Sequence, residues 1–136
     1  MPKLSARMYE ETPNMTHEEQ IALVDSKLAG SPNDWQRKVF SLILNIPSGY
    51  LVSYGHLAHC ANREYGLTLG PRNTAWLRGK LYGILGHDTD IPIHRIATQG
   101  DAESTKDHPH TKIVNRQKRT AEGTYPTPKW FTGSLT

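Results

Sequence analysis

Hydrophobic side chains recur at helical spacing in five segments of the chain. The first segment begins after Thr16, which fits a capping box with Glu19 three residues on, and it ends at Gly30. Each of the other four segments also carries its apolar residues on one face. The pattern predicts helices over residues 17–29, 34–44, 54–61, 73–85 and 111–122, with Asn33 or Asp34 capping the second.

One short β element is expected between the second and third helices. Residues 47–49 have the composition of a turn, and residues 50–53 form a strand candidate. A loop over residues 62–72 then joins the third and fourth predicted helices. The sequence therefore predicts a mainly α fold with a small β element, arranged as a helix-turn-helix with a sheet beside it.

Composition and charge narrow the class of protein. The 136 residues suffice for one hydrophobic core, and no run approaches the roughly 18 apolar residues of a membrane span. A single cysteine excludes an internal disulfide framework and a multi-cysteine zinc site. Residues 1–34 carry a net charge of −3 and residues 35–136 a net charge of +6. A basic body suits a phosphate-binding surface. With no apolar stretch near residue 1, we expect a cytoplasmic protein.

Four short segments carry a resemblance to a known family. The first comprises QRKVF at residues 36–40 and NIPSG at 45–49, and the second is VSYGHLA at 52–58. The third is PIHRI at 92–96. The fourth comprises NRQK at 115–118, EG at 122–123 and KW at 129–130. In order and spacing the chain resembles the DNA-binding domain of O6-alkylguanine-DNA alkyltransferases, and within that superfamily the alkyltransferase-like proteins. The match covers residues 34–131, so we divide the chain into an extension at 1–33 with one helix and a domain at 34–136.

The resemblance implies a winged helix-turn-helix protein that binds double-stranded DNA from the minor groove. In the family, the second helix of the motif lies in that groove, and the guanine is flipped into a pocket. The family's tyrosine, here Tyr54, crowds the neighbouring phosphate. Base flipping costs a few kcal/mol, and less for a damaged base. Ser53, Lys80 and Arg95 are further DNA-contact candidates on this basis.

The residue that fills the gap left by the flipped base has three candidates. The family uses an arginine there. Counting back from Pro92 without gaps places Trp76 at that position, Arg78 lies two residues on, and a small gap brings in Arg72. A planar cation and a flat indole can both stack between bases, so the choice stays open at this stage.

Ile93 stands where the family has its reactive cysteine. Dealkylation needs a thiolate activated by a neighbouring histidine, and His94 is present without a nucleophile beside it. Alkyltransferase-like proteins commonly have tryptophan or alanine at this position, so isoleucine is a departure. Cys60, in the third predicted helix, is expected to be a small buried residue and not a replacement. We therefore expect no enzyme activity.

A lesion pocket is expected around the PIHRI segment. Its predicted members are Tyr54, Pro92, Ile93, His94, Arg95 and, from the 98–110 loop, Ser104 and Thr105. An apolar floor at Ile93 would contact an alkyl group, at roughly 0.8 kcal/mol per methylene.

Three other polar clusters are predicted to be surface features and not catalytic or metal sites. His87, Asp88 and Asp90 lack a second cluster at zinc spacing, and we expect a solvated loop with neither metal nor cofactor. His56 and His59 read as a surface pair near phosphate. The basic run of Arg116, Lys118 and Arg119 in the last predicted helix reads as a solvated face, with phosphate contact as the alternative.

These observations favour a monomeric, non-catalytic sensor of O6-alkylguanine that marks lesions for nucleotide excision repair proteins. One alternative is a winged-helix module that binds DNA without base flipping, which Trp76 and the unusual 98–110 loop favour. A second is an enzyme that hydrolyses bases, with Asp88 or Asp90 activating water. The alkyl group preferred and the downstream partner are not encoded in any recognisable motif.

Overall fold

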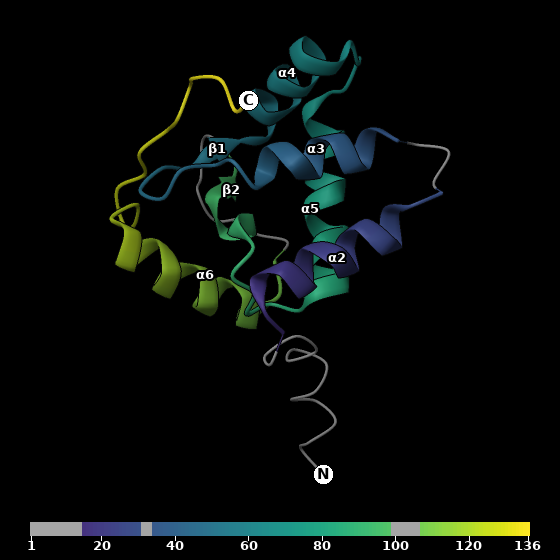
Figure 1. Ribbon diagram of the computed structural model, residues 1–136. Coiled ribbons are helices and arrows are strands. Elements are labelled where there is room, and N and C mark those ends of the chain that lie inside the picture. The colour runs from purple at the N-terminus through teal and green to yellow at the C-terminus, as the bar shows by residue number, and fades with distance from the viewer. Residues whose placement is uncertain (1–14, 31–33, 99–106) are drawn as a thin grey trace.

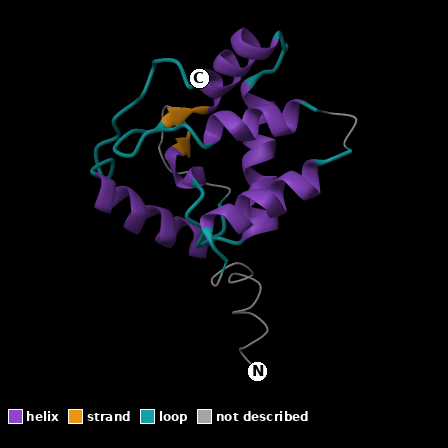
Figure 2. Ribbon diagram, viewed as in Figure 1, coloured by secondary structure: helices purple, strands orange, loops and turns teal. Residues whose placement is uncertain are grey.

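The computed structural model describes residues 15–30, 34–98 and 107–136. These residues form a mainly helical body with a small two-stranded parallel sheet, as the sequence predicted (Figures 1 and 2). The elements are α2 (His17–Leu28), α3 (Trp35–Ile43), β1 (Val52–Ser53), α4 (Tyr54–Tyr65), α5 (Pro71–Leu85), the 3₁₀ helix η1 (Pro92–Arg95), β2 (Ile96–Ala97) and α6 (Pro109–Glu122).

The first two helices agree closely with the hydrophobic pattern. The capping box of α2 is confirmed: Thr16 Oγ1 accepts a hydrogen bond from the Glu19 amide, and the Glu19 carboxylate accepts one from the Thr16 amide. Val24 and Leu28 of α2 share one core with Val39 and Phe40 of α3. Asp34 occupies the N-cap position of α3, as one of the two predicted alternatives, but its side chain makes no capping hydrogen bond; Asn33 lies outside the described residues.

The turn between α4 and α5 is shorter than predicted. The predicted loop over residues 62–72 is wrong, because α4 continues to Tyr65 and α5 begins at Pro71. Gly66 ends α4 with a φ of 66°, a conformation that glycine adopts without strain. Asn62 closes the turn by donating from Nδ2 to the Leu69 carbonyl and accepting from the Leu69 amide. The connection therefore spans only residues 66–70, which suits a helix-turn-helix better than the predicted loop did.

The sheet joins two segments that are far apart in the sequence. Strand β1 pairs in parallel with β2, with Val52 opposite Ile96 and Ser53 opposite Ala97. Leu51, within the predicted strand, instead bridges to Trp130 of the C-terminal tail. In Figure 1 the tail runs from α6 past β1 and back toward α4. The sheet thus holds η1, which contains most of the PIHRI segment, against the start of α4.

The basic run on α6 is not a solvated face. Arg119 is 1% exposed, and its Nε donates to the His94 carbonyl at 2.7 Å. Its Nη2 lies 3.4 Å from the Ile96 carbonyl. Lys118 is half-buried and donates to the Thr89 carbonyl, whereas Arg116 is exposed. The solvated-face interpretation fails because two of the three cations hold η1 and its neighbours to α6.

No helix of the described residues is long and apolar enough to cross a membrane.

Replacing Arg119 with methionine should destabilise the protein strongly. The variant leaves the His94 carbonyl without its buried donor, and we expect a loss of about 3 kcal/mol in the free energy of unfolding, measured by urea denaturation. Arg116→Met, on the exposed side of the same helix, removes a cation–π contact with Tyr125 and should lower it by no more than about 1 kcal/mol. Equal losses in the two variants would contradict the anchoring role of Arg119.

Candidate functional site

The PIHRI segment is buried at its centre. Pro92, Ile93 and His94 belong to η1, and Ile93 is 0% exposed within the hydrophobic core. Ile93 therefore does not floor an open pocket among the described residues, in contrast to the sequence-based expectation, because its side chain completes the core. Ser104 and Thr105, the two predicted pocket residues of the following loop, lie outside the described residues.

A single carboxylate ties this segment to α6. Glu122 Oε2 accepts from Arg95 Nη2 at 2.6 Å, and Glu122 Oε1 accepts from Arg95 Nε at 3.0 Å. His94 Nε2 also lies 3.1 Å from Glu122 Oε2, close enough for an electrostatic contact without the alignment of a hydrogen bond. Arg95 Nη1 donates to the Ile46 carbonyl at 2.7 Å. We call this cluster of His94, Arg95 and Glu122 the carboxylate clamp.

The clamp changes the role predicted for Arg95. Its guanidinium donates hydrogen bonds to the Glu122 carboxylate and to the Ile46 carbonyl, and its side chain is only 18% exposed. The structure therefore makes Arg95 a fold-stabilising residue and not an exposed DNA contact. The sequence analysis did not predict Glu122 as a site residue. The available signal was its position at the end of the last predicted helix, in the EG motif at residues 122–123.

Burial sets the charge states in the clamp. Burial lowers the pKa of His94 to about 4, against the opposing pull of Glu122, so the ring is neutral at pH 7. Burial alone would raise the pKa of Glu122, but the contacts from Arg95 and His94 outweigh it and lower that pKa to about 2. At neutral pH the clamp is therefore one ion pair between Arg95 and Glu122, with a neutral imidazole beside it.

Arg78 is also an internal residue. It is 4% exposed, and Nη1 and Nη2 donate to the two oxygens of Asp107 at 2.7 and 2.9 Å. Its Nε donates to the Ile96 carbonyl at 3.2 Å. Burial works against its charge, but the hydrogen bonds to Asp107 keep its pKa above the ordinary value. The predicted wedge role of Arg78 is therefore corrected, because a side chain buried in a bidentate ion pair is not available to DNA.

The other two wedge candidates remain on the surface. Trp76 is 55% exposed in the middle of α5, and Arg72 is exposed one turn before it. Lys80, one turn later, places Nζ 5.2 Å from the centre of the Trp76 ring. Positions 72, 76 and 80 repeat every four residues and so share one helix face. The structure thus gathers two cations around an exposed indole.

A hollow of about 500 Å³ opens beside this face. Trp35 and Gln36 of α3 line it together with Arg72, Asn73 and Trp76 of α5. The two indole rings lie 6.2 Å apart, centre to centre, with their planes tilted by 47°. Neither Trp35 nor Gln36 was predicted as a site residue, because no local pattern reveals that α3 meets this face of α5.

Ser53 and Tyr54 build the entrance to α4. Ser53 is the N-cap, and its hydroxyl accepts from the His56 amide at 3.0 Å, so this oxygen already has a structural partner. Tyr54 is half-buried, and its carbonyl accepts from Thr74 Oγ1 of α5 at 2.9 Å. The pair thus fixes α4 against α5.

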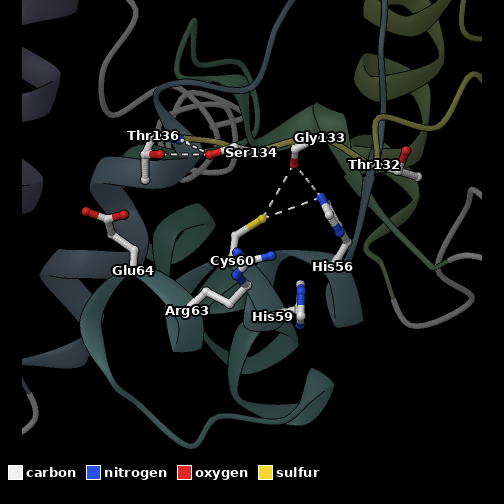
Figure 3. Close-up of a pocket in the computed structure, with 9 residues that line it drawn as sticks. All are labelled: His56, His59, Cys60, Arg63, Glu64, Thr132, Gly133, Ser134 and Thr136. Atoms are coloured by element: carbon white, nitrogen blue, oxygen red, sulfur yellow. Dashed lines mark hydrogen bonds between the residues drawn. The ribbon is translucent and has the colours of Figure 1, made fainter.

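Cys60 lies in a pocket of about 330 Å³ between α4 and the C-terminal tail (Figure 3). His56 Nε2 is 2.7 Å from the Gly133 carbonyl, which can only accept, so this nitrogen carries a proton. The Cys60 sulfur lies 3.4 Å from the same nitrogen and 3.7 Å from the same carbonyl. His56 is therefore not positioned as a base for the thiol.

Burial raises the pKa of the Cys60 thiol, which opposes formation of a thiolate. Cys60 is also 8% exposed, as expected for a buried helix residue. His59, by contrast, is exposed, and its ring stacks 6.2 Å from that of His56. The pocket therefore contains a restrained thiol and lacks the features of an activated nucleophile.

The histidine and aspartate cluster after α5 places both of its carboxylates at the surface. Among the described residues, no group of three or more His, Cys, Asp or Glu side chains is arranged to hold a metal ion. Asp88 and Asp90 have side chains that are 73% and 57% exposed, and they contact Lys118 and His17. The two aspartates are solvated, as predicted, whereas His87 is half-buried against the rings of Tyr82, His108 and His110.

No family model, curated protein or solved structure matches this chain.

The clamp should make the protein less stable in acid. His94 has a folded pKa near 4 against an ordinary 6.5, so the unfolded chain takes up a proton first as the pH falls. Stability is complete above pH 6.5 and should fall by about 3 kcal/mol toward pH 4, with a further loss as Glu122 titrates below its ordinary 4.5 toward 2.

The matched variants for this test are His94→Gln and His59→Gln. Urea denaturation at several pH values should show a clearly shallower slope between pH 6.5 and 4 for His94→Gln and an unchanged slope for the exposed His59→Gln. A wild-type stability that stays flat over this range would rule out the depressed pKa of His94.

Proposed function

We propose that this protein is a non-catalytic, DNA-binding recognition protein of the helix-turn-helix type that detects O6-alkylated guanine in duplex DNA. The observation that carries the proposal is the exposed Trp76 on α5, with Arg72 and Lys80 on the same face. Single exposed apolar residues are common, but Trp76 adjoins Trp35, and a contiguous aromatic patch marks an interaction surface. An indole with flanking cations offers base stacking and phosphate neutralisation together.

The arrangement of α4 and α5 supports this role. A five-residue turn, closed by Asn62, joins the two helices, and Ser53 and Tyr54 fix their packing. In helix-turn-helix proteins, the second helix enters a groove of DNA while the first supports it. We assign α5 to the minor groove, with Trp76 as the residue that enters the base stack, and a winged-helix arrangement for the domain.

Two features support the absence of alkyl transfer. Ile93 has no nucleophilic atom, and its side chain is sealed in the core. The sole cysteine of the chain is held as a thiol by burial and by the Gly133 carbonyl. A protein that binds the lesion without reacting leaves the alkyl group on the DNA. The proposal therefore implies that nucleotide excision repair proteins act afterwards, and it places the protein in the cytoplasm.

A second candidate function is DNA binding without base flipping. The complete burial of Ile93 favours it, because a flipped base needs a pocket beside the PIHRI segment. The two functions share the α5 surface and differ only in whether the altered base changes affinity.

Replacing Trp76 with alanine should weaken duplex binding by about 10-fold. Stacking of one base on an aromatic ring contributes about 1–3 kcal/mol, and 1.4 kcal/mol is a factor of ten. Fluorescence anisotropy with a labelled duplex at one fixed salt concentration measures the effect. The matched control is Ile113→Ala, since Ile113 of α6 is 56% exposed and lies outside the proposed surface.

The same titration separates the two candidate functions. A duplex with one O6-methylguanine should bind the wild-type protein at least about fivefold more tightly than the unmodified duplex, since a mispaired base is easier to extrude. Equal affinities would exclude the lesion sensor and leave the module without flipping. Equal losses for Trp76→Ala and Ile113→Ala would exclude α5 as the binding surface.

A further inference from the structure

We propose that the hollow lined by Trp35 and Trp76 binds one unpaired nucleobase through stacking and through hydrogen bonds to the base's carbonyl oxygens. The inference rests on the proposed DNA binding and adds to it a second stacking residue, Trp35, and a class of ligand. The hollow is formed by two helices, α3 and α5, and it is lined by two indoles, two amides and the cation of Arg72.

Two amide side chains give the hollow its polarity. Gln36 Oε1 accepts from Lys80 Nζ at 2.8 Å, and Asn73 Oδ1 accepts from the Gly70 amide at 2.8 Å. An ammonium and a backbone amide can only donate, so these bonds fix which end of each side chain is the oxygen. Nε2 of Gln36 and Nδ2 of Asn73 are thus left without a partner among the described residues.

The hollow therefore presents hydrogen-bond donors and no free amide acceptor from these two residues. Gln36 is 3% exposed, so its position is set by the packing of α3 and by the bond to Lys80. Donors of this kind match the carbonyl oxygens of thymine, cytosine or guanine. A paired base has these atoms engaged with its partner, whereas an unpaired base offers them freely.

The aromatic rings supply the second part of recognition. Trp35 and Trp76 contact each other with their ring centres 6.2 Å apart and their planes tilted by 47°, and both line the hollow, so a flat ligand can stack on one ring and meet the other at an angle. The volume of about 500 Å³ exceeds that needed for a single base. Such a shape suits a flat heterocycle better than a peptide side chain.

Charge complementarity favours a base that is attached to its phosphates. Arg72 lines the hollow, and Lys80 sits against the Trp76 ring and against Gln36. These two cations lie where the backbone phosphates on either side of an inserted base can be neutralised. The occupant is therefore an extrahelical nucleotide of a DNA strand, such as the one that loses its partner when a guanine is displaced.

The test compares a duplex that carries one unpaired thymine with a fully paired duplex of the same flanking sequence. Anisotropy titrations use the full chain, as wild type, Trp35→Ala, Trp35→Phe and Ile113→Ala. The wild type should bind the bulged duplex about tenfold more tightly, and Trp35→Ala should remove most of that preference. Trp35→Phe keeps an aromatic ring in place, so it should lose less of the preference for the bulged duplex than Trp35→Ala does. Ile113→Ala should keep the full preference.

The outcomes separate this inference from the proposed function. If Trp76→Ala weakens binding to paired duplex but Trp35→Ala keeps the preference for the bulge, the hollow is not the base site and the α5 surface stands. If the wild type shows no preference for the bulge, the inference is wrong while duplex binding remains. If the wild type binds neither DNA, both proposals are wrong.

Discussion

The carboxylate of Glu122 holds the 3₁₀ helix η1 to the C-terminal end of α6. It receives Arg95 in a two-bond ion pair and lies beside the neutral ring of His94, which joins η1 to the end of α6. Arg119, one turn earlier on α6, adds a bond to the His94 carbonyl. Because η1 continues into β2, and β2 pairs with β1, these contacts also set the start of α4. The placement of α4 and of the sheet thus depends on a small internal network of charge.

This network divides the basic residues of the chain into two groups. Arg78, Arg95 and Arg119 face inward and satisfy carboxylates and backbone carbonyls. Buried cations need such partners, since removal of one partner leaves a costly unpaired charge. Arg72 and Lys80 stay outside, on the face of α5 that carries Trp76. Because Arg78 and Arg95 are paired with Asp107 and Glu122, these ion pairs add nothing to the net charge, and the net positive charge of the body comes from the remaining cations.

Periodicity predicted the helices well, because each buries one apolar face, and capping chemistry located the start of α2. The end of α4 was missed because Asn62, Arg63 and Glu64 are as suitable for a polar helix surface as for a loop. Burial of Arg78 depends on Asp107, 29 residues away, and no local pattern reveals such a pair. The same holds for the hollow, which exists only because α3 brings Trp35 against α5. Local sequence thus predicted the elements, and the tertiary contacts decided which of their polar residues reach solvent.

The most direct test of the account follows the indole N–H signals by NMR while unlabelled duplex DNA is added to the ¹⁵N-labelled protein. The chain has three tryptophans, of which Trp76 lies on the proposed surface and Trp130 pairs with Leu51 in the tail. The account predicts that the Trp76 signal shifts progressively to saturation while the Trp130 signal stays in place. A Trp76 signal that remains unchanged at saturating DNA, or a shift confined to Trp130, would contradict it.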